Sequence, residues 1–300
     1  MTGRSLKMNP WRTRAVRRQR PTARDVRAAF NEVCSSFPFE DYLSEATFHE
    51  VYAAIEGLKT LCSRFEGMRI LDLGSGAMEK PAVFRKLGFD CYAIDDLQDP
   101  WHQRGNHRAE IKQFAAMNGI NFHLGSFETA ESSFPNASFD VVSSFNTIEH
   151  LHGSPRALLN AMGHLARPNG LILLVMPNAV NLRKRLDVLR GRTNYVNISQ
   201  YFHQIGEWRG HVREFTLNEM RYICESTGFH VVHCRAFETL AFDKLGSLLR
   251  QFYLAITSLL PTLRTSLLVI AQKPVTWTPL EGNEETSRRT LAGAIPEGVR

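Results

Sequence analysis

Seven short segments rich in branched apolar residues recur along the chain, and stretches with the apolar spacing of helices separate them. Such runs are typical of strands that are covered on both faces of a sheet. The seven candidate strands are Met68–Leu73, Asp90–Ile94, Asn121–Leu124, Asp140–Phe145, Leu171–Met176, His230–Arg235 and Leu267–Gln272. Alternating strands and helices predict an α/β fold with a Rossmann-like, doubly wound, mostly parallel seven-stranded sheet.

The flanking regions differ from this alternating body. Helical spacing of apolar residues, as at Val26, Phe30 and Val33, predicts two helices ahead of the sheet. With 300 residues and 43% hydrophobic content, one large core is expected. We therefore predict a disordered basic arm at 1–22, a helical extension at 23–66, one main domain at 67–274 with insertions at 178–210 and 240–262, and a flexible tail at 275–300.

The net charge of +6 is concentrated at the start of the chain. Residues 1–30 hold nine basic residues and one acid, which leaves a net −2 for the rest. Such a run is usually a solvated tail, and binding to nucleic acid or to anionic lipid is the alternative. No stretch reaches the roughly 18–20 apolar residues that a membrane span needs. The five cysteines form no C-x-x-C pair, so we expect no metal site and a cytoplasmic protein.

The first candidate strand runs directly into a glycine turn, Met68-Arg-Ile-Leu-Asp-Leu-Gly-Ser-Gly76. Two glycines there let the backbone bend sharply and lie against a ligand. The next strand ends in Asp95 and Asp96, about twenty residues on, where a carboxylate can accept both hydroxyls of a ribose. Glu79 occupies the place where dinucleotide binding needs a third glycine, which disfavours a nicotinamide cofactor. The order of these elements predicts a nucleoside site.

These motifs resemble the class I S-adenosylmethionine-dependent methyltransferases, in particular the small-molecule type, over residues 68–236. The segment 70–76 matches the first motif of that family, and 92–95 matches the second. The segment 139–151 is similar to the fourth-strand pattern F-D-x-V followed by E-H-L, and 165–173 to the turn into the fifth strand. His211-Val-Arg-Glu-Phe-Thr216 is similar to the H-x-R-x-F-T segment before the last helix.

The resemblance implies S-adenosylmethionine as the cofactor and assigns residues to it. The glycine turn would lie against its methionine end, the acids after the second strand would hold the ribose, and Gly125–Glu128 would flank the adenine. The assigned residues are Asp72, Gly74, Ser75, Gly76, Asp95, Asp96, Ser126, Phe127 and Asn146. The chain departs from the family at Met78, where a glycine is frequent, and at Ser126, where an aspartate commonly contacts the adenine.

The methyl acceptor is less constrained. Transfer from a sulfonium mainly requires an acceptor placed in line, and an oxygen acceptor also gains from a general base. Glu149 and His150 follow the fourth strand, and His211 lies in a segment expected to fold over the site; a hydrogen-bonded structural role is the alternative for each histidine. The absence of a Pro-Cys dipeptide and of an Asn/Asp-Pro-Pro-aromatic run argues against common nucleic-acid methylations. We expect O-methylation of a small molecule, a saccharide or a lipid-linked intermediate.

Two other functions remain open: an RNA methyltransferase that uses the basic arm, and a non-catalytic cofactor-binding protein. The apolar stripe in 242–260 has a similar ambiguity. It would face the core, as such stripes usually do, or it would contact a membrane surface or an apolar substrate. The sequence does not indicate an oligomeric state.

Overall fold

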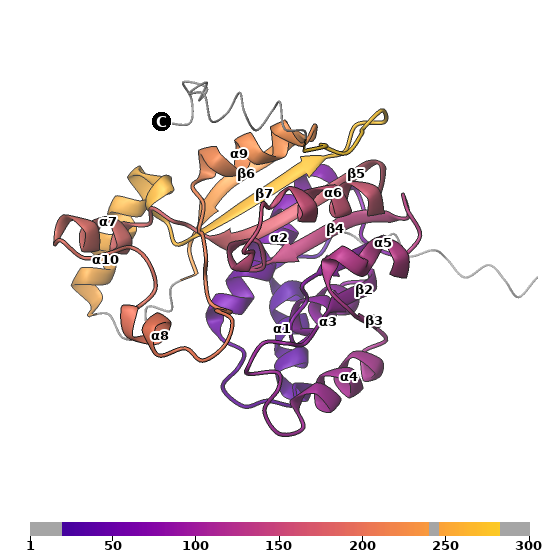
Figure 1. Cartoon of the computed structure of the whole chain (residues 1–300), viewed down its shortest axis with the longest axis horizontal. Coiled ribbons are helices and arrows are strands. Elements are labelled where there is room, and N and C mark those ends of the chain that lie inside the picture. The colour runs from indigo at the N-terminus through magenta and orange to yellow at the C-terminus, as the bar shows by residue number, and fades with distance from the viewer. Residues whose placement is uncertain (1–19, 240–245, 283–300) are drawn as a thin grey trace, which may run out of the picture.

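The structure is a computed structural model, and it describes residues 20–239 and 246–282 (Figure 1). Most of the predicted basic arm lies outside these ranges, so its disorder stays a prediction. Among the described residues, no helix combines the length and the apolar character that crossing a membrane requires.

A seven-stranded sheet forms the centre of the protein, with the strand order β3-β2-β1-β4-β5-β7-β6. β7 runs antiparallel to both of its neighbours, whereas the other pairs are parallel. The predicted Rossmann-like, mostly parallel sheet is confirmed, and β5 begins five residues earlier than predicted. The strands are β1 Arg69–Leu73, β2 Asp90–Asp95, β3 Asn121–Leu124, β4 Phe139–Phe145, β5 Ala166–Pro177, β6 His230–Phe237 and β7 Ser266–Gln272.

The helices begin where the sequence supplies a cap. Thr22 and Asp25 form a capping box at the start of α1, and Thr216 and Glu219 form another at α9; each box satisfies backbone N–H groups that the first helical turn leaves unpaired. The helices are α1 Ala23–Ser36, α2 Glu45–Leu61, α3 Glu79–Lys86, α4 His107–Met117, α5 Ala130–Ser133, α6 Arg156–Leu165, α7 Leu182–Leu189, α8 Ile198–Phe202, α9 Leu217–Ser226 and α10 Ser247–Leu259.

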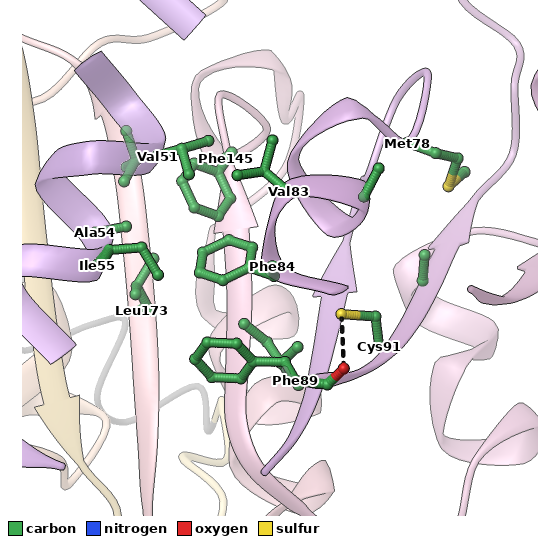
Figure 2. Close-up of a cluster of buried hydrophobic side chains, with 14 of the residues drawn as sticks. Val51, Ala54, Ile55, Met78, Val83, Phe84, Phe89, Cys91, Phe145 and Leu173 are labelled. Carbon is green, nitrogen blue, oxygen red and sulfur yellow. Dashed lines mark hydrogen bonds between the residues drawn. The ribbon is translucent and has the colours of Figure 1, made fainter. Parts of the chain in front are cut away.

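Both faces of the sheet are covered, because alternate residues of each strand point to opposite sides. Ile70 of β1 belongs to one buried cluster, which is packed by α1 to α4, and Leu71 belongs to the other, which is packed by α5, α6 and α9. Figure 2 shows the first cluster, in which Phe84 of α3 lies between the strands and Ile55 of α2. This double covering explains the near-continuous apolar character of the strands.

Residues after β7 return to the helices beside the sheet. The Trp277 ring stacks on Phe229 at 5.6 Å, and its Nε1–H donates to the Thr227 carbonyl at 2.8 Å. Gly163 in α6 makes room for that ring, because an added Cβ would approach it to 2.3 Å. The first part of the predicted tail is thus held against α6 and α9, and residues 283–300 lie outside the described part.

The two predicted insertions carry α7, α8 and α10, which lie together at one side of the molecule (Figure 1). Within α10, Thr257 is buried, but Leu248, Phe252 and Leu259 are 83%, 64% and 82% exposed. The core-facing interpretation of the apolar stripe is therefore wrong for these residues. Its first part, 240–245, lies outside the described residues.

Candidate cofactor and acceptor site

The glycine turn after β1 is tied to the end of β2. The backbone N–H of Gly74 donates to the Ile94 carbonyl at 2.9 Å, and the N–H of Gly76 donates to Asp95 Oδ2 at 2.8 Å. Gly74 has φ +74°, a left-handed conformation that favours glycine, and an added Cβ would come within 2.5 Å of Thr147 Oγ1. The turn can therefore approach β4 only because a glycine occupies this position.

Two adjoining cavities open at the carboxyl ends of β1, β2 and β4, where open α/β sheets bind their ligands. Their volumes are about 370 and 400 Å³. All nine residues assigned to the cofactor line one or both of them, so the structure brings the whole predicted set together. The residues shared by the two cavities are Gly74, Asp95, Asp96, Thr147, His150 and Arg209.

Asp72 presents an unsatisfied carboxylate oxygen at the first cavity. Its Oδ1 accepts a hydrogen bond from Ser143 at 2.8 Å, whereas Oδ2 has no partner within the described part of the chain. Burial raises the pKa of Asp72 to about 7, because the charged form loses its hydration. A cationic group in the cavity would satisfy Oδ2 and favour the ionised carboxylate.

These features fit S-adenosylmethionine. The five acids of the first cavity, against Lys80 and Arg209, suit a ligand that carries a sulfonium and an ammonium group. The unpartnered oxygen of Asp72 matches the ammonium group. Asp95 can accept the ribose hydroxyls although it already accepts two backbone N–H groups, because each carboxylate oxygen has two lone pairs.

Met78 does not obstruct this cleft. It adopts the left-handed conformation at φ +71° that a glycine would take more readily, which costs roughly 1–2 kcal/mol. Its side chain is fully buried among core residues (Figure 2), where its sulfur lies 3.4 Å from the Ser75 hydroxyl. The departure from the family's glycine therefore affects the core and not the open space of the site.

Several cleft residues were not predicted, because they come from distant segments without a motif. Tyr42 from the loop before α2 and Trp101 from the loop after β2 line the first cavity, and their ring centroids lie 4.5 Å apart. Lys80 Nζ lies 2.7 Å from Glu79 Oε1 and 3.7 Å from Glu50 Oε2 in α2. The side-chain amide of Asn146 donates to Glu50 Oε1 at 2.9 Å. This buried network anchors α2 against the site.

Glu149, His150 and His211 come together next to the cleft. The backbone N–H groups of Val212 and Arg213 donate to the Glu149 carbonyl at 2.7 and 3.2 Å, which holds the segment after α8 against the end of β4. The His150 and His211 rings lie nearly perpendicular, with centroids 4.9 Å apart. The three predicted catalytic candidates therefore form one cluster.

The cluster combines a buried acid with oriented imidazoles. The carboxyl oxygens of Glu149 have no hydrogen-bond partner among the described residues, and burial raises its pKa to about 8. His211 Nδ1 lies 2.9 Å from Glu214 Oε1, and Glu214 also pairs with Lys184. Burial and the neighbouring His150 lower the pKa of His211 to about 4, so its ring is neutral near pH 7.

A third cavity of about 380 Å³ lies on the far side of His211. It is lined by residues of the first insertion, including Tyr195 and Val196, together with Glu214. His150 lines the two cofactor cavities and His211 lines the third, so the two imidazole rings lie between the cofactor cleft and the third cavity.

The segment Trp208–His211, which we name the crossing segment, passes over the cleft. The ring nitrogens of His150 and His152 lie 2.7 Å from the carbonyl oxygens of Arg209 and Trp208. The Arg209 guanidinium lies 3.9 Å from Asp96 Oδ2. The two histidines after β4 thus fasten this segment above the boundary of the two cofactor cavities.

Comparisons with known proteins agree with this fold. The profile of a family described as a methyltransferase domain matches residues 47–234. A ubiquinone biosynthesis O-methyltransferase of Rickettsia felis is 27% identical over 137 residues, which cover 45% of this chain and 50% of that enzyme. The chain thus spans half the length of this curated relative.

Two solved structures are similar to this chain at low identity, and the first of them, with a TM-score above 0.5, has the same fold. A chain of the Haloferax volcanii complex between the Trm112 methyltransferase activator and a methyltransferase has a TM-score of 0.51 and 17% identity, and the match covers 85% of this chain and 99% of that one. The 1,6-didemethyltoxoflavin-N1-methyltransferase of Burkholderia thailandensis, solved with S-adenosylhomocysteine, has a TM-score of 0.48 and 15% identity, with coverage of 85% and 91%.

The chain belongs to the methyltransferase-domain family, because the family match covers more than half of its length. The predicted class, the S-adenosylmethionine-dependent methyltransferases, and the predicted cofactor are confirmed.

Proposed function

We propose that the protein transfers a methyl group from S-adenosylmethionine to a hydroxyl oxygen of a small molecule that binds in the third cavity. The observation that carries this proposal is the contact between His150, which lines the cofactor cleft, and His211, which lines the third cavity. The similarity to an enzyme named as an O-methyltransferase supports oxygen as the acceptor atom. A saccharide or a lipid-linked intermediate would present the same chemical group.

The roles of the residues follow from their positions. S-Adenosylmethionine, when bound, supplies an electrophilic methyl group. Asp72 holds the ammonium group, Asp95 and Asp96 hold the ribose hydroxyls, and Gly74, Ser75 and Gly76 lie against the methionine part. Ser126 and Phe127 flank the adenine, and Asn146 closes the first cavity. Glu149, His150 and His211 contact the acceptor and orient its oxygen, and the proton that the hydroxyl loses passes to solvent in the open cleft. Such alignment can supply roughly 7–11 kcal/mol of barrier reduction.

The test is methyl transfer from tritiated S-adenosylmethionine into a fractionated cell extract. Label in water-soluble small molecules, saccharides or lipids supports the proposal. Label in RNA that disappears when residues 1–19 are removed would favour the RNA methyltransferase, and this truncation spares α1. Cofactor binding without label in any fraction would favour a non-catalytic protein. The variant Asp95→Ala serves as the inactive control.

We further propose a peripheral membrane contact through α10. Leu248, Phe252 and Leu259 are largely exposed, and Leu189 of α7 and Phe202 of α8 are 82% and 75% exposed. The helices α7, α8 and α10 lie on the same side of the molecule (Figure 1). Residues 246–265 contain two arginines and no acid, and residues 182–192 contain five basic residues and one acid. Exposed apolar side chains flanked by basic residues suit an anionic lipid surface.

Vesicle flotation tests this contact. The full-length protein should float with vesicles that contain anionic lipid and much less with zwitterionic vesicles. The double variant Leu248→Ser/Phe252→Ser should lower binding by at least about tenfold, because each buried apolar side chain contributes about 1.5–3 kcal/mol. Gln251→Ala, on the same helix, should behave as the unmodified protein. Equal flotation of the double variant, or none of the unmodified protein, would refute the contact.

A further inference from the structure

The cluster at the junction of the cavities has the composition of a metal site. One carboxylate oxygen of Glu149 and one ring nitrogen each of His150 and His211 lie within 4.8 Å of one another. The Glu149 side chain is fully buried, and neither of its oxygens has a hydrogen-bond partner in the part of the chain that the structure describes; Oε1 lies 3.9 Å from His211 Nε2. A buried carboxyl group of this kind is costly unless a cation or a donor satisfies it.

Both histidines are oriented by their other ring nitrogen. Nδ1 of His150 lies 2.7 Å from the Arg209 carbonyl oxygen, and Nδ1 of His211 lies 2.9 Å from Glu214 Oε1. A ring nitrogen that donates to oxygen carries the proton, so Nε2 keeps its lone pair for another partner. Metal-binding histidines are usually held in this way by a carbonyl or a carboxylate. Lys184, through its ion pair, in turn fixes Glu214.

We propose that Glu149, His150 and His211 bind a divalent transition-metal ion such as Zn²⁺. Two imidazoles and one carboxylate suit Zn²⁺ and similar ions, which bind such ligands at about 2.0–2.2 Å and leave a further position open. Small rotations of the three side chains would bring the ligand atoms to that distance. The site was missed in the sequence because Glu149 and His150 are adjacent and the third ligand follows 61 residues later, outside any familiar metal-binding spacing.

The position of the ion gives it a role at the acceptor. His150 borders the cofactor cavities and His211 borders the third cavity, so an ion held between them would lie close to both the cofactor and the acceptor. This role rests on the proposed function, whereas binding of the ion does not. The ion would then select acceptors that offer oxygen atoms able to bind a metal.

Titration of the chelator-treated full-length protein with Co²⁺ tests the site. We expect one Co²⁺ per chain, visible d–d absorption, and displacement by Zn²⁺ followed by metal analysis. Glu149→Gln and His211→Ala should lower Co²⁺ affinity by on the order of 100-fold, and Glu214→Gln, which only orients His211, by about tenfold. His230→Ala is the control, because this histidine is exposed at the start of β6 and lies outside the cluster.

Glu149→Gln preserves the shape of the side chain and removes a buried acid that has no hydrogen-bond partner, so the variant should fold as the unmodified protein does. Circular dichroism verifies this. Substoichiometric Co²⁺ binding, unchanged affinity in Glu149→Gln, or an equal loss in His230→Ala would overturn the metal site. Full methyl transfer by metal-free protein would remove its catalytic role and leave the proposed function standing. One bound Co²⁺ without any methyl transfer would support the site and contradict the proposed function.

Discussion

The buried carboxyl of Asp72 predicts that cofactor affinity depends on pH. Its pKa of about 7 arises from burial and is opposed by the Ser143 hydroxyl and by Lys80, while Glu79 and Asp95 raise it further. The ammonium group of the cofactor binds the ionised form, so low pH weakens binding. With a pKa of about 7 the ionised fraction is about 10% at pH 6 and about 90% at pH 8, which predicts about ninefold tighter binding at pH 8.

Calorimetric titration with S-adenosylhomocysteine from pH 6 to pH 8 measures this dependence without turnover. Asp72→Asn should bind weakly and lose most of the slope. Ser143→Ala, which removes the hydrogen bond to Oδ1, should move the midpoint to higher pH. Asp90→Asn, at the opposite end of β2, is the control and should titrate as the unmodified protein. A flat profile, or the same slope in Asp72→Asn, would refute the assignment of Asp72 to the ammonium group.

The raised pKa of Asp72 also makes the stability of the ligand-free protein depend on pH. Because the folded pKa lies above the unfolded value of 3.8, the ligand-free protein should lose stability as pH rises from about 4 to about 7. A difference of about three pH units corresponds to about 4 kcal/mol. Thermal unfolding at pH 5 and pH 8 should therefore show that Asp72→Asn stabilises the ligand-free protein more at pH 8, and the opposite order would contradict the burial argument.

Three further substitutions test the site and its supports. Asp95→Ala should weaken S-adenosylhomocysteine binding at least about tenfold, or 1.4 kcal/mol, in the same calorimetric assay; unchanged affinity would show that the acid after β2 does not hold the ribose. Gly74→Ala should lower both stability and affinity, because the new methyl group would meet Thr147 in a left-handed backbone, and denaturant unfolding with binding would show both losses. Gly163→Ala should cost about 1–3 kcal/mol of stability by displacing Trp277 and should leave cofactor affinity unchanged; a loss of affinity without a loss of stability would contradict this reasoning.

Local patterns predicted the sheet well, and the residues that they assigned to the cofactor line one cleft. Each strand is a short run with its own composition, and the turn from Asp72 to Gly76 is contiguous in sequence, so its geometry could be inferred from the glycines. Asp95 could be placed beside that turn because successive parallel strands end at the same edge. The N-cap signals at Thr216 and Glu219 likewise depend on neighbouring residues alone.

Long-range pairings could not be predicted in the same way. The contact of Glu50 with Lys80 and Asn146 joins segments that are 30 and 96 residues apart, and no periodicity records it. The apolar pattern of α10 was visible, but the pattern does not say which face has a partner. Leu248 is exposed because α10 projects to the side of the sheet.

The contacts that hold the crossing segment in place affect the rates at which ligands bind and leave. A nucleoside that spans both cofactor cavities would contact Arg209, which lines both and whose backbone and side chain are held by His150 and Asp96; we expect this residue to cover the bound ligand. Entry and exit would then occur only while these contacts are broken, which slows association and dissociation together and leaves the equilibrium constant to the contacts beneath. Under such gating, the release of S-adenosylhomocysteine, rather than methyl transfer, would limit the rate of turnover.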